Sequence, residues 1–296
     1  MSPKRPAAHH GLVVVDKPAG MTSHDVVGHC RRVFGQRQVG HGGTLDPSAT
    51  GVLLVGLGSA TRLLRFVSAL PKSYVGEMVL GTETTTLDAD GETAATYDMA
   101  GVTLEEVRTA AATMVGEIDQ VPPMVSAVQV GGRRLYQLAR EGVEVEREPR
   151  RVTIFALGVE ATDQPGVFTM AADCSSGTYV RSIAADLGKA LGGGAHLRAL
   201  RRIAVGPFTV ADAVALEDVG VANVVSPATA VAHLDTVVMD AATAAKAAHG
   251  AVLCGADVGM DGEGPWAAFD SEGRLLAVYE ARPDGTAKPS VVLAGA

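Results

Sequence analysis

The chain has 296 residues, of which 47% are hydrophobic and 20% are charged. This balance excludes a disordered or collagen-like chain, and the length allows one large domain with a smaller one beside it. The longest nearly apolar stretch, residues 51–60, is about half as long as a membrane-spanning helix requires. We therefore expect a soluble, cytoplasmic protein that does not enter a membrane.

The net charge of −8 is unevenly distributed. Residues 210–296 contain 4 basic and 12 acidic side chains, which accounts for all of the excess. The preceding segment is neutral and contains local arginine clusters, which can bind phosphates even in an acidic protein. Taken alone, the charge pattern favours a solvated surface over a nucleic-acid interface.

The three cysteines, Cys30, Cys174 and Cys254, lie far apart and form no CxxC pair. The sequence therefore indicates neither a disulfide framework nor a thiolate metal site. The histidines His24 and His29 lack the i, i+4 spacing of a zinc-binding helix. The segment GLGSAT at residues 56–61 lacks the third glycine of a dinucleotide-binding loop, so no nucleotide cofactor is expected.

Short apolar runs and alternating segments predict strands interspersed with helices. The predicted strands are, in chain order, residues 12–15, 52–55, 73–81, 125–130, 152–161, 167–174 and 202–205. The predicted helices are a first one capped by Thr22 or Ser23, followed by residues 59–70, 103–115, 135–140 and 178–191. Because no regular βαβ repeat occurs, the pattern favours an α+β fold with antiparallel pairing.

The ends of the chain differ in composition from its centre. Residues 1–10 are expected to be a disordered tail, and residues 11–225 the main domain. From about Asp235 onward, short apolar runs alternate with glycine-rich turns, which predicts a small β-rich domain over residues 226–296.

The most informative segment is GHGGTLDPSATG, residues 40–51. Its glycines allow a tight backbone path, and Pro47 biases Asp46 away from helical backbone. A carboxylate on such a loop is presented to its surroundings rather than packed in a core. Taken alone, however, the local pattern favours an Asx turn at Asp46 over a catalytic role.

Six segments together carry a family resemblance. They are GLVVVDKPAGMTSHDVV, GHGGTLDPSATGVLLVGLGSATRLL, KSYVGEMVLGTETTTLDADGE, QVPPMVSAVQVGGRRLYQLAREG, SSGTYVRSIAADLG and GAHLRALRRIAVGPF. In these segments and in their order, residues 11–209 resemble the bacterial TruB family of tRNA pseudouridine-55 synthases. The resemblance implies a pseudouridine synthase fold, with a largely antiparallel central sheet, flanking helices and a small C-terminal PUA-like domain.

The activity implied by the resemblance is isomerisation of one T-loop uridine of tRNA to pseudouridine, by a catalytic domain over residues 11–225. The implied partner is the T-stem and T-loop of tRNA, bound by a monomer, and neither a metal nor an organic cofactor is implied. A uridine inside a folded loop is stacked, so the enzyme must flip it out.

The resemblance also implies roles for individual residues. Asp46 matches the family's catalytic aspartate, which could attack the base, attack ribose C1′ or remove a C2′ proton. Arg181 matches the arginine that pairs with this aspartate, and Tyr74 matches the active-site tyrosine that stacks on the target base. His41 matches the side chain that fills the space left by the flipped base, and Leu200 matches an apolar contact to that base.

Several arginines lie in or beside the matched segments and are candidate phosphate contacts. They are Arg133, Arg134, Arg140, Arg198, Arg201 and Arg202. Asp88 and Asp90 are interpreted as turn residues. Gln129 stands where the family commonly has lysine, which weakens a polar contact there, and the acidic end of the chain is unusual for an RNA-facing surface.

Two other functions compete with isomerisation. A tRNA-folding chaperone would bind the same RNA but would tolerate replacement of Asp46 by asparagine. An unrelated hydrolase using Asp46 would incorporate water or release free uracil.

Overall fold

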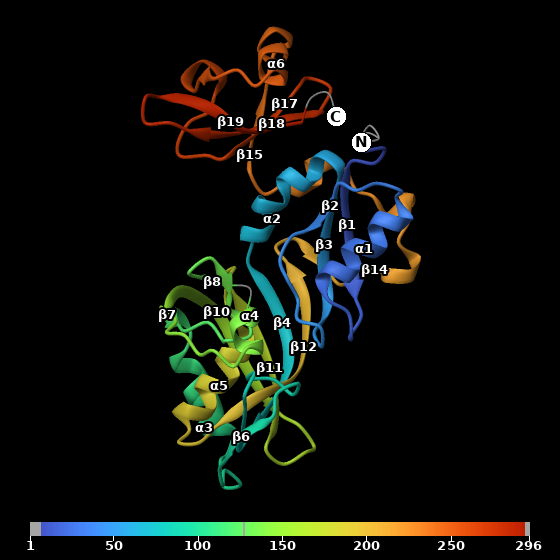
Figure 1. Ribbon diagram of the computed structural model, residues 1–296. Helices are drawn as coiled ribbons and strands as arrows, with labels where there is room; N and C mark the ends of the chain where they lie inside the picture. Colours follow the sequence, from blue (N-terminus) through green and yellow to red (C-terminus); the bar gives the residue numbers. More distant parts are fainter. Residues whose placement is uncertain (1–6, 127, 294–296) are drawn as a thin grey trace. The chain divides into compact units, whose positions relative to one another are not determined.

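The structure, a computed structural model, describes residues 7–126 and 128–293. Its contacts divide the chain into two compact units (Figure 1). The first unit takes in the chain up to Asp46, Leu53–Ser68 and the chain from Ala211 onward, and the second comprises Pro47–Val52 and Ala69–Val210. Among the residues that the structure describes, no helix combines the length and apolar character needed to cross a membrane.

A small sheet covered by one helix forms the N-terminal part of the first unit. β1 (Gly11–Lys17) runs parallel to β14 (Val214–Ala215) and neighbours β3 (Thr50–Leu57). β2 (Val39–His41) pairs antiparallel with the end of β3, and α1 (Ser23–Val33) packs against this sheet. The shared core consists of Val13, Val15, Val26, Val27, Cys30, Phe34, Val39, Leu53, Val55, Leu57, Leu216 and Val219.

The start of α1 agrees with the sequence prediction. The Thr22 hydroxyl accepts a hydrogen bond from the backbone N–H of Asp25 at 3.1 Å, and the Asp25 carboxylate accepts one from the Thr22 N–H at 2.9 Å. This capping box satisfies two N–H groups that a helix start otherwise leaves without partners.

Part of the predicted N-terminal tail contacts the first unit. The backbone N–H of His9 donates to the side-chain oxygen of Gln36 at 3.0 Å, and the backbone N–H of Ser59 donates to His10 Nδ1 at 2.9 Å. Residues 7–10 therefore have specific partners, whereas residues 1–6 of the predicted tail lie outside the described residues.

Short helical segments follow β3 and β14. After β3, the chain forms η1 (Gly58–Leu63) and α2 (Leu64–Ala69), where the sequence predicts a single helix over residues 59–70. Three further turns follow β14: η2 (Leu216–Asp218), η3 (Val221–Asn223) and η4 (Pro227–Val231).

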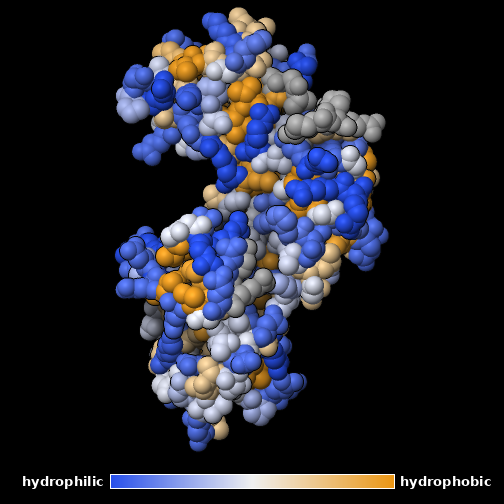
Figure 2. Space-filling model, viewed as in Figure 1, coloured by the Kyte–Doolittle hydropathy of each residue, from blue (hydrophilic) through white to orange (hydrophobic). Residues whose placement is uncertain are grey.

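The C-terminal sheet domain, residues 235–293, has five strands in the order β15-β17-β18-β19-β16. Its elements are β15 (Asp235–Val238), α6 (Ala241–Ala248), β16 (Leu253–Cys254), η5 (Ala256–Val258), β17 (Trp266–Phe269), β18 (Leu275–Ala281) and β19 (Thr286–Val292). Trp266, Tyr279 and Leu253 lie in its buried core. Figure 2 shows many hydrophilic side chains on the visible surface of this domain. The predicted β-rich character of this segment is confirmed.

The second unit contains a mostly antiparallel sheet with helices packed against it. Its strand order is β3-β12-β4-β11-β10-β7, where only the short β3–β12 pairing at Thr50 and Gly51 is parallel. The strands not yet given are β4 (Lys72–Leu80), β7 (Gly116–Gln120), β10 (Arg150–Ala161), β11 (Val167–Cys174) and β12 (Ala195–Val205). α5 (Val180–Ala190) packs on β12 and α3 (Leu104–Thr113) on β10 (Figure 1). The predicted α+β class is confirmed.

Smaller elements complete the second unit. They are the hairpin of β5 (Thr82–Thr84) and β6 (Thr93–Thr96), the hairpin of β8 (Gln129–Val130) and β9 (Arg133–Arg134), α4 (Leu135–Arg140) and β13 (Phe208–Thr209). The prediction of a strand over residues 125–130 was wrong for Val125, Ser126 and Val128, because β8 begins only at Gln129. The prediction of a short strand over residues 202–205 missed most of β12, which begins at Ala195.

Candidate active site

The loop between His41, the last residue of β2, and Asp46 is closely packed. The backbone N–H of Gly42 donates to the Leu54 carbonyl at 2.8 Å, which holds the loop against β3. A Cβ atom at Gly42 would lie 3.0 Å from Val67 Cγ2, closer than ordinary van der Waals contact, so glycine fits here best. Leu45 is buried, whereas Asp46 is half-buried. The loop therefore buries the residue before the carboxylate and leaves Asp46 partly accessible.

His41 is half-buried at the end of β2 and contacts a second histidine. The ring of His24, in the first turn of α1, lies 6.2 Å from the His41 ring between centroids, at an interplanar angle of 85°. This is an edge-to-face arrangement, which aromatic rings favour over direct stacking. The two imidazoles belong to the same unit as Asp46.

Tyr74 lies in the middle of the second unit's sheet. On β4 it is paired with Ala172 of β11 on one side and with Arg202 of β12 on the other. Tyr74 is largely buried. A strand with neighbours on both sides holds its backbone firmly, so the ring projects from a rigid support.

Arg181, near the start of α5, has a side chain that is only 5% exposed. Its guanidinium donates to the carbonyls of Thr86 and Val125, both at 2.8 Å, and forms an ion pair with the Asp88 carboxylate at 3.1 Å. A planar guanidinium has donors in a fixed geometry, so these contacts set its orientation.

Asp88 pairs with the candidate site residue Arg181, a contact that the sequence did not predict. It lies in the turn after β5, as predicted, where its Oδ1 accepts from the Asp90 backbone N–H at 3.2 Å. Its other carboxylate oxygen binds Arg181, and its side chain is 13% exposed. No local signal identifies this pair, because the two residues are far apart in the sequence.

The predicted phosphate-binding arginines fall into different environments. Arg133 and Arg134 are exposed on the β8–β9 hairpin, where Arg133 pairs with Glu141. Arg198 binds Glu77 at 2.9 Å and Gln164 at 2.7 Å. Arg140 belongs to α4, but its side chain lies outside what the structure describes.

Arg201 and Arg202 are neighbours on β12 with opposite environments. Arg201 is half-buried and lies 3.4 Å from the Thr50 hydroxyl. Arg202 is 1% exposed and donates to the Val52 carbonyl at 2.7 Å. This bond makes Arg202 a structural contact between β12 and β3, and its burial gives no support to the phosphate contact, which stays a prediction. Leu200, on the same strand, is half-buried opposite Gly76.

A second buried cation lies on β4, two residues before Tyr74. Lys72 is buried, and its ammonium donates to the Leu70 carbonyl at 2.7 Å. Burial, with the charge of Arg202 as the next contribution, lowers the pKa of Lys72 to about 8. Burial also raises the pKa of the Cys174 thiol, which lies opposite Lys72 on β11, to about 11. Cys174 is thus a neutral thiol at physiological pH.

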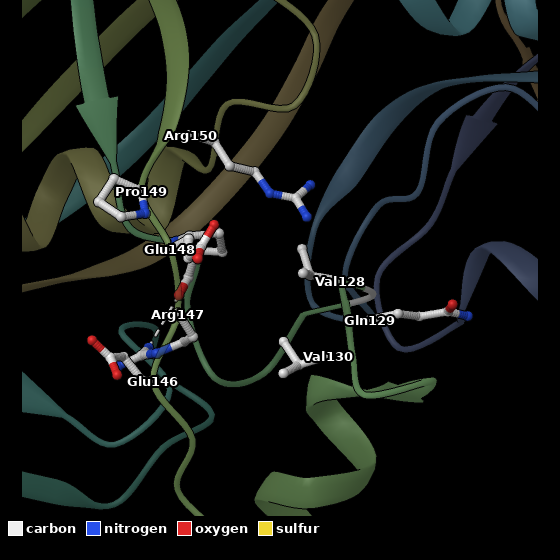
Figure 3. A pocket seen from close by; sticks show the side chains of 9 residues that line it. Val128, Gln129, Val130, Glu146, Arg147, Glu148, Pro149 and Arg150 are labelled. Atoms are coloured by element: carbon white, nitrogen blue, oxygen red, sulfur yellow. Dashed lines mark hydrogen bonds between the residues drawn. The ribbon is translucent and has the colours of Figure 1, made fainter.

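A pocket of about 470 Å³ lies under the β8–β9 hairpin (Figure 3). Val128, Gln129 and Val130 line one side, and residues 146–150 line the other. Arg147 is held in its wall by a hydrogen bond to the Pro122 carbonyl at 3.0 Å. Neither Tyr74 nor Arg181 lines this pocket. Gln129, which does line it, is paired with the exposed Arg134 in the β8–β9 hairpin. Within the described residues, no group of three or more His, Cys, Asp or Glu is arranged to hold a metal ion.

Comparison with known proteins identifies the family. Residues 31–180 match the TruB family pseudouridylate synthase (N terminal domain), and residues 181–245 match the tRNA pseudouridylate synthase B C-terminal domain. The first match alone spans half of the chain. The chain belongs to the TruB family. The TruB match includes Asp46 and Tyr74 in its first part and begins its second part at Arg181.

Individual TruB relatives extend this match to nearly the whole chain. The tRNA pseudouridine synthase B of Mycobacterium sp. (strain KMS) is 48% identical over 289 residues, which cover 96% of each protein. That of Syntrophotalea carbinolica is 53% identical over 208 residues, covering 70% of this chain and 68% of the relative. Among solved structures, a chain of the "Crystal Structure of a Cbf5-Nop10-Gar1 Complex" aligns with a TM-score of 0.72 at 27% identity, over 94% of this chain and 80% of that one. These matches confirm the predicted TruB membership and pseudouridine synthase fold.

Proposed function

We propose that this chain converts the T-loop uridine at position 55 of tRNA to pseudouridine. As a TruB-family tRNA pseudouridine synthase it is an isomerase. The observation that carries the proposal is the 48% identity to a tRNA pseudouridine synthase B over 96% of both chains, which includes every segment predicted to hold a site residue. The substrate would be bound through the T-stem and T-loop, by a monomer in the cytoplasm.

The reaction rearranges one nucleotide without adding or removing atoms overall. The C1′–N1 bond breaks, the uracil turns, and a C1′–C5 bond forms. C5 then loses its proton and N1 gains one. Because the sum of these steps is an isomerisation, no oxidant or group donor is consumed.

In this proposal Asp46 supplies the reactive carboxylate. Attack on the base, attack on ribose C1′ and removal of a C2′ proton all require the ionised carboxylate. Arg181 would favour that ionised form and direct it through charge-assisted hydrogen bonds. The contacts of Arg181 with Asp88, Thr86 and Val125 support this role, because they hold the guanidinium in one orientation.

Tyr74 would stack on the uracil and assist proton transfer at the base or the sugar. Its rigid place in β4 supports a stacking role, since a fixed ring loses little entropy when a base binds. His41 would enter the T-loop and fill the space left by the flipped uridine, and Leu200 would contact the flipped base. Flipping costs a few kcal/mol, which these contacts would offset.

Phosphate contacts would come from the exposed and half-buried arginines. Arg133 and Arg134 are candidates on the β8–β9 hairpin, and Arg198 and Arg201 are candidates on β12. RNA of this kind is recognised mainly through its folded shape and its splayed bases. The C-terminal sheet domain would contribute little phosphate binding, because acidic residues predominate in its sequence.

The replacement Asp46→Asn tests this proposal. The assay measures tritium released from a tRNA transcript labelled at uridine C5, because the reaction exchanges that hydrogen. We expect release by the wild-type protein, none by Asp46→Asn, and normal release by Asp235→Asn, which changes an exposed carboxylate of the C-terminal sheet domain. Tight tRNA binding without release by the wild type would instead favour a chaperone, and free uracil would favour a hydrolase.

A further inference from the structure

One buried hydroxyl connects α1 to the loop that carries Asp46. The Ser23 hydroxyl accepts a hydrogen bond from the backbone N–H of Leu45 at 2.9 Å and donates one to the Leu45 carbonyl at 3.1 Å. Ser23 is 2% exposed, so water does not compete for these bonds. A hydroxyl has one donor and two acceptor positions, and here it serves both polar groups of a single residue.

The Leu45 carbonyl belongs to the peptide bond that leads into Asp46. Because that peptide is planar, fixing its oxygen also fixes the direction of the Asp46 N–H and Cα. On the other side of Asp46, Pro47 restricts the Asp46 backbone to extended conformations. The backbone at Asp46 is thus constrained from both sides by groups that are not themselves reactive.

The support for Ser23 is itself rigid. The buried Lys17 ammonium donates to the carbonyls of Pro18 at 2.8 Å and Met21 at 2.6 Å, which fixes the turn before the helix. The capping box of Thr22 and Asp25 then fixes the first turn of α1. A hydrogen bond from a mobile residue would not orient the loop, whereas one from this turn does.

The same helical turn also meets the other end of the loop. His24, the next residue after Ser23, makes the edge-to-face contact with His41 described above. Residues 23 and 24 therefore contact both ends of the segment between His41 and Asp46. The side chains involved lie within one unit of the structure.

We infer that Ser23 is a positioning residue for the isomerisation, acting through the Leu45 peptide on the Asp46 carboxylate. This inference rests on the proposed function of Asp46. Without the hydroxyl, the buried Leu45 N–H and carbonyl lack these two bonds, and the loop shifts to recover others. A displacement of about 1 Å at a reacting group can lower a rate by about 100-fold. RNA binding would be largely preserved, because the arginines proposed as phosphate contacts lie on β9 and β12 and not on this loop.

The test compares Ser23→Ala with Ser59→Ala. Ser59 is a matched control, because it is also buried in the first unit and its hydroxyl is hydrogen-bonded to His10, at 3.0 Å, and not to the Leu45 peptide. Three quantities are measured for each protein: the single-turnover rate of tritium release at saturating enzyme, the Kd for tRNA, and amide hydrogen exchange over residues 43–46.

For Ser23→Ala we expect a single-turnover rate at least about 10-fold lower, a tRNA Kd within about twofold of wild type, and faster exchange of the Leu45 amide. Ser59→Ala should match wild type in all three. An unchanged rate in Ser23→Ala, or an equal loss in both variants, would overturn the inference. Should Ser23→Ala fail to fold, Ser23→Cys retains a weaker donor and acceptor and is expected to give an intermediate rate.

Failure of the proposed function is distinguishable from failure of this inference. If the wild type releases no tritium, the proposed function fails, while the exchange measurement still reports whether Ser23 fixes the loop. Faster Leu45 exchange in Ser23→Ala with an unchanged rate of tritium release would show a structural contact that does not act on catalysis, and would overturn the inference alone.

Discussion

Arg181 and Asp88 form an ion pair at 3.1 Å in which the two side chains are 5% and 13% exposed. The pair links the start of α5 to the turn after β5, and the guanidinium also donates to the Thr86 and Val125 carbonyls. In a buried ion pair, the attraction contributes less to stability than is lost when one partner is removed, because the remaining charge stays buried. Asp88 thus has a defined electrostatic task besides its place in a turn.

We predict that Asp88→Asn impairs both stability and catalysis. Removing the charge breaks a buried ion pair, which costs about 3 kcal/mol or more of unfolding free energy. Urea unfolding and the single-turnover rate are the measurements. Asp119→Asn is the control, because Asp119 pairs with Arg151 on the exposed side of β7 and β10, where the pair contributes little. Equal effects of the two replacements would contradict the role assigned to Asp88.

Replacing Arg202 should lower stability, whereas replacing its neighbour Arg201 on β12 should weaken tRNA binding. Arg202→Met removes a buried hydrogen bond to Val52 and is expected to lower the unfolding midpoint strongly. Arg201→Gln should leave that midpoint nearly unchanged and weaken tRNA binding. Thermal unfolding and filter binding measured on both variants decide this. A selective loss of tRNA affinity in Arg202→Met, with unchanged stability, would refute a structural role of Arg202.

The β8–β9 hairpin should contribute to binding through charge. Arg133→Gln is expected to weaken tRNA binding and to reduce the slope of log Kd against log salt concentration by about one. The control is Arg151→Gln, an exposed arginine paired with acidic residues on β7 and given no role in RNA binding. An unchanged slope of log Kd against log salt concentration in Arg133→Gln would show that Arg133 does not contact a phosphate.

Lys72 should make stability depend on alkaline pH. Its pKa of about 8 lies below the ordinary value of 10.5, because burial disfavours the charged form. Between these values the unfolded chain binds more protons than the folded one, so the contribution of Lys72 to stability rises with pH. The free energy of unfolding of wild type relative to Lys72→Met should therefore increase between about pH 8 and pH 10.5. A difference that is flat or falls over this range would contradict the burial of the charge.

Gly51 should tolerate no side chain. Its φ is +100°, and a Cβ would lie 2.1 Å from the Arg202 carbonyl oxygen, where β3 and β12 pair. We expect Gly51→Ala to unfold at a much lower urea concentration than wild type. Gly158→Ala on β10 is the control, because nothing lies within 4 Å of the added carbon. A midpoint for Gly51→Ala close to that of Gly158→Ala would be inconsistent with this close approach.

The sequence predicted the helices and strands that have a clear capping or alternation pattern in their own residues. The capping residues at Thr22 mark the start of α1, and alternating apolar residues mark β4. β7, with the sequence GEIDQ, has too few apolar residues to be read as a strand, and it forms by pairing with β10. The seven residues of β12 that were missed include two arginines and a histidine, which obscure the strand pattern.

Sequence motifs were enough to name candidate site residues, but not to find their tertiary contacts. The family segments identified Asp46, Tyr74 and Arg181 as candidates, but the partner of Arg181 became evident only from the fold. Likewise, adjacent arginines at positions 201 and 202 look equivalent in the sequence. On a strand their side chains point to opposite faces, so only the structure distinguishes a buried guanidinium from a partly accessible one.

The central claim is that this chain isomerises one uridine of the tRNA T-loop. The most direct measurement maps pseudouridine at single-nucleotide resolution in a tRNA transcript after incubation with the wild-type protein, alongside a transcript in which uridine 55 is replaced by cytidine. We predict modification at position 55 alone in the first transcript and none in the second. Modification at other uridines, or none in either transcript, would contradict the claim.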